Sequence, residues 1–183
     1  MALIVETGSA SATANSYVSV EYADAYFSLY GNDAWPATPT VDDGTLALKQ
    51  TSLIKATQAL DSLYGCEYKS FPFTQDQALL FPRFAFYLNE RQICNSNTIP
   101  KDLMNAVCEV ALIDINQGNI FPDVSELGVV KESLIKLDVL EKRTIYNDTV
   151  SNERLSGFYK IERLLRQILE SDEDGEVYSM LGS

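Results

Sequence analysis

Apolar side chains recur every three or four residues in four stretches of this 183-residue chain, and glycine or proline borders three of these stretches. This spacing puts the apolar residues on one face of an α-helix, so the chain is constrained to fold mainly as packed helices. Helices are expected near 20–30, 43–64, 100–117 and 152–169. Ser19 is a typical N-cap, Pro100 suits a first helical turn, and Gly31, Gly65 and Gly118 are typical stops. The expected buried faces are Ala23, Tyr26, Phe27 and Tyr30; Leu46, Leu53, Thr57, Leu60 and Tyr64; Leu103, Ala106, Val107, Val110 and Ala111; and Phe158, Ile161, Leu164, Leu165 and Ile168.

The segments between these stretches have other patterns. Residues 129–139 alternate apolar and charged side chains, which is typical of a strand, and 144–150 are its expected hairpin partner. Residues 65–98 are rich in aromatics and are expected to be a long loop pinned to the helices by those side chains. Residues 7–16 are small and polar and are expected to form an extended arm or loop. The predicted fold is mainly α: a small helical bundle with a minor antiparallel β-hairpin and extended N- and C-terminal arms.

One domain accounts for most of the chain. It is expected to span 1–170, with an N-terminal arm at 1–18 and a strand-like insertion at 129–150. Residues 171–183 form an acidic C-terminal tail that ends in the apolar group Val177, Tyr178, Met180 and Leu181. The tail is either disordered or a docking peptide that becomes ordered on a partner.

Charge and missing residue types narrow the function. The chain has 14 Lys and Arg against 26 Asp and Glu, a net charge of −12, and no histidine. Histidine triads and histidine-bound zinc are therefore excluded, and no nucleotide-binding glycine loop is present. The three cysteines have no metal or disulfide spacing, and an EF-hand alignment on Gly175 puts Leu181 where the last acidic ligand is needed. We expect no enzyme activity, no cofactor and no metal.

Acidity also argues against a nucleic-acid binder, because such proteins neutralise phosphates with Lys and Arg. One feature favours nucleic-acid binding. Arg83 and Arg91 flank an aromatic stretch, which is typical of a stacking platform for single-stranded DNA. The alternative is that these arginines pair with the surplus carboxylates, for example as a buried ion pair at Arg83. A hydrolase that uses carboxylates alone has no positive feature in its favour.

Several motifs together resemble one family of phage virion proteins. They are Ala14-Asn15-Ser16-Tyr17-Val18-Ser19-Val20, Ala23-Asp24-Ala25-Tyr26-Phe27, Trp35, Leu53-Ile54-Lys55-Ala56-Thr57 with Leu60-Asp61 and Tyr64, Gln77-Ala78-Leu79, Phe81-Pro82-Arg83, and Ile99-Pro100 followed by Ala106, Glu109 and Ala111-Leu112. In these motifs the chain is similar to the head–tail connector, or neck adaptor, proteins, sequences of which are also labelled DnaT-like single-stranded-DNA-binding proteins. The likeness covers about 1–115 well and 129–169 more loosely.

The resemblance implies a structural virion protein that forms a ring, usually twelvefold, beneath the portal. The ring would extend the DNA channel and provide the platform for tail attachment. Expected partners are the portal protein, a tail or nozzle protein, and other copies of this chain, which would pair through the N-terminal arm or the strand region. Genomic DNA would pass without sequence-specific binding, and no membrane is involved. The chain would be made in the host cytoplasm and reside in the virion neck.

Portal contacts are expected from the last helix and the tail, because related connectors grip the portal with a C-terminal segment. The candidate residues are Ile161, Leu165, Val177, Tyr178, Met180 and Leu181. The alternative function is that of a single-stranded-DNA-binding accessory protein.

Overall fold

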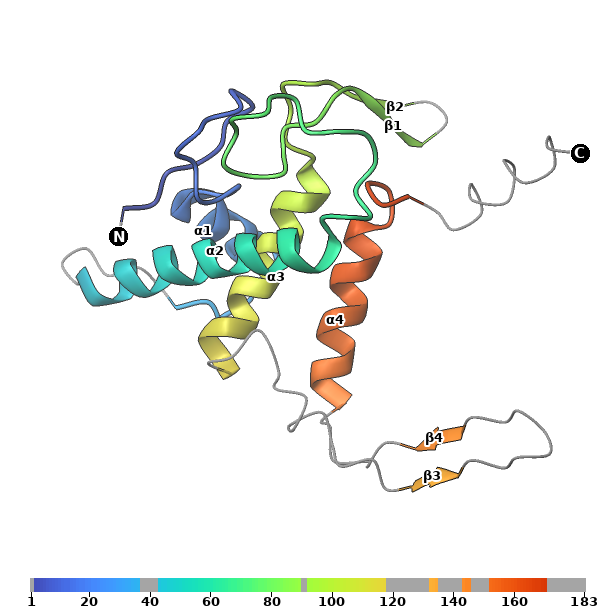
Figure 1. Cartoon of the computed structure of the whole chain (residues 1–183). Coiled ribbons are helices and arrows are strands. Elements are labelled where there is room, and N and C mark those ends of the chain that lie inside the picture. The colour runs from blue at the N-terminus through green and yellow to red at the C-terminus, as the bar shows by residue number, and fades with distance from the viewer. Residues whose placement is uncertain are drawn as a thin grey trace, which may run out of the picture.

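Four helices form the body of the computed structural model, which describes residues 2–36, 43–89, 92–117, 132–134, 143–145 and 152–170. They are α1 (Val20–Leu29), α2 (Asp43–Tyr64), α3 (Lys101–Gln117) and α4 (Asn152–Leu165). Helix α3 packs against both α2 and α4, and α1 contacts α2 and α3 (Figure 1). The mainly helical fold expected from the sequence is therefore confirmed.

Local signals set the helix ends much as predicted. The Ser19 hydroxyl accepts a hydrogen bond from the Tyr22 backbone N–H at 3.2 Å, which satisfies one donor of the first turn of α1. Gly31 follows the C-cap with φ +59°, a left-handed conformation that glycine adopts without steric cost. Helix α2 has the predicted bounds, and α3 begins one residue after Pro100. Gly118 lies outside the described residues.

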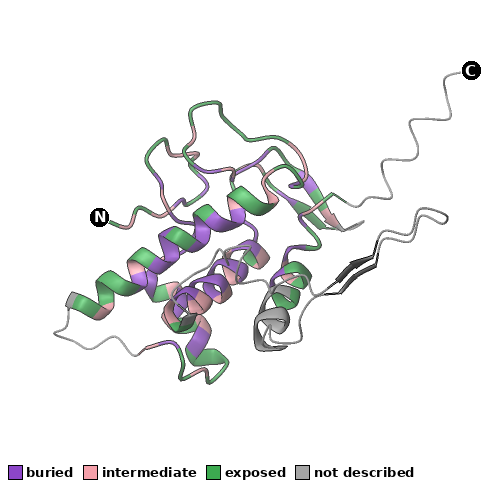
Figure 2. Cartoon of the chain, turned by 60° about the horizontal axis from the view of Figure 1, so that its bottom comes forward, coloured by how far each residue is buried: buried purple, intermediate pink, exposed green. Residues whose placement is uncertain are grey.

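The core surrounds α3, which contacts each of the other three helices, and it takes buried side chains from α1, α2 and α4 (Figure 2). Leu53 and Leu60 of α2 are buried, as is the whole predicted stripe of α3. Two residues expected on buried faces are exposed instead, which corrects that prediction: Leu46 in the first turns of α2, and Tyr30 just after α1. Both lie at helix ends, where the apolar spacing continues but no neighbouring helix among the described residues covers these side chains.

The segment between α2 and α3 contains a hairpin that the sequence did not reveal. Strand β1 (Phe86–Asn89) pairs antiparallel with β2 (Gln92–Cys94). Phe81 and Phe86 are buried and pin this segment to the body, as predicted. For Phe71, Phe73, Phe84 and Tyr87 that prediction is wrong, because their rings are exposed.

A second hairpin confirms the strand prediction in part. Strand β3 (Glu132–Leu134) pairs antiparallel with β4 (Arg143–Ile145), so the described parts of both predicted segments contain the expected paired strands. The alternating residues Ile135, Leu137 and Val139 lie outside the described residues, as does the tail at 171–183.

The N-terminal segment was expected to be an extended arm or a loop, and the structure shows a folded loop. The buried Glu6 carboxylate accepts hydrogen bonds from the backbone N–H groups of Gly8, Ser9, Ala10 and Ser11 at 2.7 to 3.1 Å. The side chain of Asn15 bonds back to Ala2 and Ile4. Residues 2–16 are thereby held as a loop by their own polar groups.

None of the helices in the described ranges has the length and apolar character of a membrane span.

Candidate functional site

The sequence motifs converge on a polar network inside the body, where the N-terminal segment meets α2 and the following loop. The Tyr17 hydroxyl lies 2.8 and 2.9 Å from the two oxygens of Asp61 and donates its proton to this carboxylate. The same hydroxyl accepts from the Phe81 N–H at 3.0 Å, and the Leu80 N–H donates to Asp61 at 3.2 Å. Burial raises the pKa of Asp61 to about 6, although these hydrogen bonds and Arg83 oppose the shift. The network ties three chain segments together.

Arg83 is the centre of the aromatic loop. Its guanidinium donates to the backbone carbonyls of Lys69 at 2.9 Å, Tyr68 at 3.2 Å and Ser70. It lies 5.8 Å from the ring centres of both Tyr68 and Phe81. The expected carboxylate partner is replaced by carbonyls, and the buried guanidinium does not face solvent as a stacking platform requires. Arg91 lies outside the described residues.

A second polar cluster fixes the end of α1 to the start of α2. Lys49, whose side chain is 0% exposed, is 2.5 Å from Asp24 and 5.2 Å from the centre of the Trp35 ring. The Trp35 indole N–H donates to the same Asp24 oxygen at 2.6 Å. A buried lysine needs such a partner, because an unpaired buried charge is costly.

A third cluster joins α1, α3 and α4 at Glu109. The Tyr26 hydroxyl and the Lys160 ammonium each donate to one Glu109 oxygen at 2.6 Å. All three clusters are occupied by partners from within the chain. The motif residues in them are therefore explained by the fold, and a functional surface has to be sought outside them.

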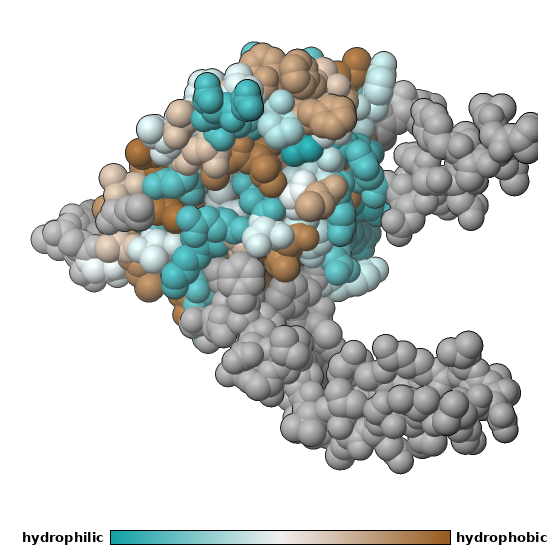
Figure 3. Space-filling view, in the orientation of Figure 1, coloured by the Kyte–Doolittle hydropathy of each residue, from teal (hydrophilic) through white to brown (hydrophobic). Residues whose placement is uncertain are grey.

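Exposed aromatic side chains form such a surface on the loop between α2 and α3 and on its hairpin. We call Phe71, Phe73, Phe84, Tyr87 and Ile93 the aromatic surface. Phe71 is 75% exposed and Tyr87 60%, while Phe73 and Phe84 pack edge to face with ring centres 5.5 Å apart. Hydrophobic side chains gather at this end of the molecule (Figure 3). Apolar clusters of this kind on a small protein mark an interaction site.

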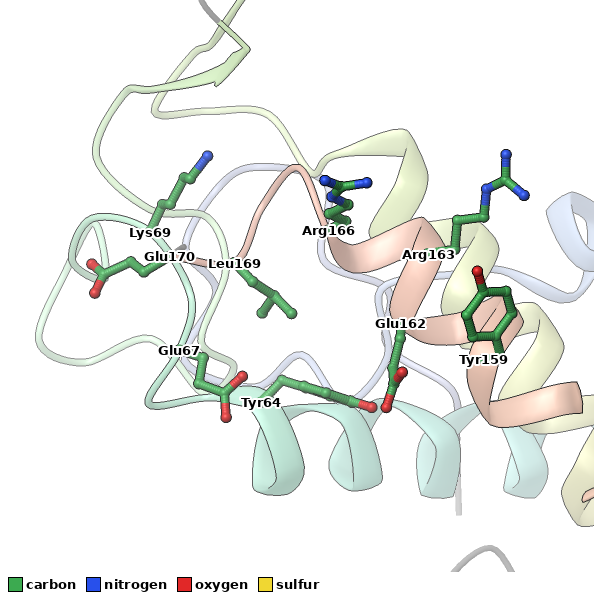
Figure 4. A pocket seen from close by; sticks show the side chains of 9 residues that line it. All are labelled: Tyr64, Glu67, Lys69, Tyr159, Glu162, Arg163, Arg166, Leu169 and Glu170. Atoms are coloured by element: carbon green, nitrogen blue, oxygen red, sulfur yellow. The ribbon is translucent and has the colours of Figure 1, made fainter. Parts of the chain in front are cut away.

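A groove of about 780 Å³ lies beside this surface, between the end of α2 and α4. Figure 4 shows its lining, with Lys69, Arg166 and Arg163 along one side, Glu67 and Glu162 on the other, and Glu170 beside Lys69. We call Lys69, Arg163 and Arg166 the cation row. The Lys69 ammonium donates to the Gln167 carbonyl at 3.0 Å and to the Tyr87 carbonyl at 3.5 Å, so the cation row adjoins the aromatic surface.

The predicted portal contacts do not form one surface in the described structure. Ile161 is 1% exposed and Leu165 0%, so both face the protein's own core. The other four candidates, Val177, Tyr178, Met180 and Leu181, lie outside the described residues.

Sequence reasoning missed the cation row, although Arg163 and Arg166 are three residues apart on a predicted helix and must share a face. Lys69 joins them only through the fold.

Comparison with known proteins places this chain in a family. Residues 1–181 match the model of the family described as "Putative DnaT-like ssDNA binding protein", and the chain belongs to that family. This description corresponds to the second of the two functions considered from the sequence. No curated protein and no solved structure matches the chain. In the described residues, no group of three or more His, Cys, Asp or Glu side chains is arranged to hold a metal ion.

Proposed function

We propose that this chain is a structural virion protein, a head-to-tail adaptor that forms a ring under the portal and serves as the platform for tail attachment. The observation that carries the proposal is the aromatic surface, whose apolar rings are exposed to solvent. The motif residues form contacts within the protein, so this surface is left for a partner. Such a surface is suited to assembly with other proteins. Because the sequence motifs resemble those of neck adaptors, we propose that the assembly is the ring between portal and tail.

Charge supports a role as the wall of a DNA channel. Among the cations whose side chains the structure describes, Lys49 and Arg83 are buried, and Lys55 and Lys160 bond to the carboxylates of Asp114 and Glu109. The others are Lys101 and the cation row, and the cation row shares its groove with three carboxylates. The chain as a whole carries −12. A negative wall repels phosphate, so a genome could pass along it without sticking.

The proposed partners follow from this role. They are the portal protein above, a tail or nozzle protein below and further copies of the chain in a ring, which in related adaptors is usually a dodecamer. The chain would need no cofactor and would carry no enzyme activity. Its proposed location is the virion neck, after synthesis in the host cytoplasm.

Co-sedimentation with purified portal rings tests the proposal. The full chain should sediment with the rings, and a chain truncated after Glu170 should remain soluble and folded but bind less, because the tail is proposed to grip the portal. Equal binding by the truncated chain would contradict the role of the tail. Absence of binding by the full chain would contradict the adaptor function.

Single-stranded-DNA binding is the second candidate, because the family description names it and one feature of the surface fits it. Four exposed aromatic rings adjoin the cation row, and rings beside cations can stack bases and contact phosphates. Three phosphate contacts predict a log–log salt slope of about −2 for single strands. A gel shift at micromolar protein and physiological salt, with this slope and lost in Arg163→Gln/Arg166→Gln, would place this candidate first.

A further inference from the structure

We infer that the groove between the end of α2 and α4 binds an extended segment of a partner protein in which acidic and basic side chains alternate. This inference does not rest on the proposed function, because any partner protein with such a segment would fit. The groove is the one in Figure 4, and its volume of about 780 Å³ is within the range of ligand-binding sites.

The charges that line this groove are divided between its two sides. The cation row lies along one side, and Glu67 and Glu162, which we call the carboxylate side, lie along the other (Figure 4). Glu170 lies beside Lys69, so three cations and three carboxylates line the groove. The lining as a whole therefore favours neither sign of charge. Its selectivity depends on where each charge of the ligand falls.

The six charged side chains of the groove do not neutralise one another. Within the described part of the chain, no ion pair includes any of the six. The Lys69 ammonium donates to two backbone carbonyls and is half-buried, and the other five side chains are exposed. A ligand can therefore supply carboxylates to one side and cations to the other, and such complementarity fixes its register.

The rest of the lining is apolar or aromatic and consists of Tyr64, Tyr159 and Leu169. Tyr64 and Leu169 are half-buried against the core, and Tyr159 is exposed. Burial and the nearby carboxylates of Glu162 and Glu67 raise the pKa of Tyr64, so its hydroxyl remains a hydrogen-bond donor. These side chains offer contact to the aliphatic stems of lysine and glutamate, whose charged ends reach the two sides.

An extended chain matches this division of charge. Its successive side chains point to opposite sides, so alternating acidic and basic residues put each carboxylate against the cation row and each cation against the carboxylate side. The groove follows α4 from Tyr159 to Arg166, a distance of about 10 Å, and continues to Lys69 and Glu170. About three extended residues span the first part, and about eight leave room for the continuation.

Nucleic acid fits the groove less well than such a peptide. Its phosphates all carry negative charge, so they would be attracted by the cation row and repelled by Glu67, Glu162 and Glu170. A peptide that is wholly acidic or wholly basic has the same fault. Only a ligand with both signs of charge can satisfy both sides.

An NMR titration of the full chain with two capped octapeptides tests the inference. One has four Glu-Lys repeats, and the other has two Glu-Glu-Lys-Lys repeats, with the same composition and net charge. When extended, the second places only half of its charges on the matching side in any register, whereas as a helix it has an acidic and a basic face. The first should bind at least about fivefold more tightly at low salt, because it forms more matched pairs.

Charge reversal on each side of the groove provides a second test. Arg163→Glu/Arg166→Glu makes both sides acidic, and Glu67→Lys/Glu162→Lys makes both sides basic. Each double variant should weaken binding of the Glu-Lys peptide by at least about fivefold. The acidic variant should instead bind capped octalysine, and the basic variant should bind capped octaglutamate.

Glu21→Lys/Asp33→Lys is the matched control for the reversal of Glu67 and Glu162. It changes the net charge by the same amount at exposed positions that do not line the groove. Binding of the Glu-Lys peptide to this control should equal binding to the unmodified chain. Circular dichroism confirms that each variant is folded.

Equal binding of the two octapeptides, or tighter binding of the Glu-Glu-Lys-Lys peptide, would overturn the inference, as would unchanged binding by the reversed variants. Tighter binding of oligothymidylate that is lost in Arg163→Glu/Arg166→Glu would assign the groove to nucleic acid and also overturn it. Portal co-sedimentation is a separate measurement. Peptide binding without portal binding would contradict the adaptor function alone, and portal binding without peptide binding would contradict this inference alone.

Discussion

At the residue scale, the motifs that identify the family are fold determinants. Tyr17, Asp24, Trp35, Asp61 and Arg83 each bond to partners within the chain. The sequence motifs singled out these residues, but their structural roles depend on contacts between segments that are far apart in the chain. Tyr17 and Asp61 are separated by 44 positions, and no local pattern indicates that they meet.

Two tyrosines in this region should respond oppositely to loss of the hydroxyl. The Tyr17 hydroxyl bonds to Asp61 and to the Phe81 N–H, whereas the buried Tyr68 hydroxyl has no partner among the described residues. Tyr17→Phe should lower the free energy of unfolding by about 1–3 kcal/mol, and Tyr68→Phe should leave it unchanged or raise it by up to about 1 kcal/mol. Urea unfolding of the two variants provides the comparison. Equal losses would show that the Tyr68 hydroxyl has a partner.

Asp61 should make stability depend on pH. Burial raises its pKa from 3.8 to about 6, so the folded state holds the proton more tightly than the unfolded state does. This contribution is complete below pH 4 and is lost as pH rises through 6. Relative to Asp61→Asn, the wild type should lose roughly 3 kcal/mol across this window, at about 1.4 kcal/mol per pKa unit. Urea unfolding of both proteins between pH 4 and 7.5 measures the difference, and parallel pH profiles would contradict the assignment.

At the element scale, helices were predictable because their signals are local. The N-cap Ser19, the stop at Gly31 and the buried stripe of α3 can be read from adjacent residues. The β1–β2 hairpin was not predictable, because a four-residue and a three-residue strand carry too little alternation to distinguish them from an aromatic loop. On the predicted buried face of α4, Ile161, Leu165 and Ile168 are buried and Leu164 is half-buried, while the side chain of Phe158 lies outside the described part of the chain. The portal contacts proposed for Ile161 and Leu165 remain a prediction, and both side chains pack inward in this structure.

Helix α4 therefore allows a direct check on whether Ile161 serves the core or a partner. Ile161→Ala should lower the free energy of unfolding by about 2–5 kcal/mol, because it leaves a cavity in the core. Tyr159→Ala, at an exposed position on the same helix, should change it by less than about 0.5 kcal/mol. Thermal unfolding distinguishes the two. A small loss at Ile161 would mean that this side chain is available to a partner.

At the scale of the whole molecule, the fold separates two kinds of surface. The loops beyond the end of α2 carry exposed aromatic rings (Figure 3). The groove beside them is charged and is lined by Lys69, Arg163 and Arg166 together with Glu67, Glu162 and Glu170 (Figure 4). Composition predicted the negative charge but not this division, because Lys69 and the two arginines are brought together only by the packing of α4 beside the segment that follows α2.

The central claim is that this chain works as an assembly subunit in the virion neck. Image reconstruction of the intact particle that encodes it tests this most directly. The account predicts the four-helix body in a ring directly beneath the portal. Absence of the chain from the particle, together with salt-sensitive binding of the pure protein to single-stranded DNA, would contradict it.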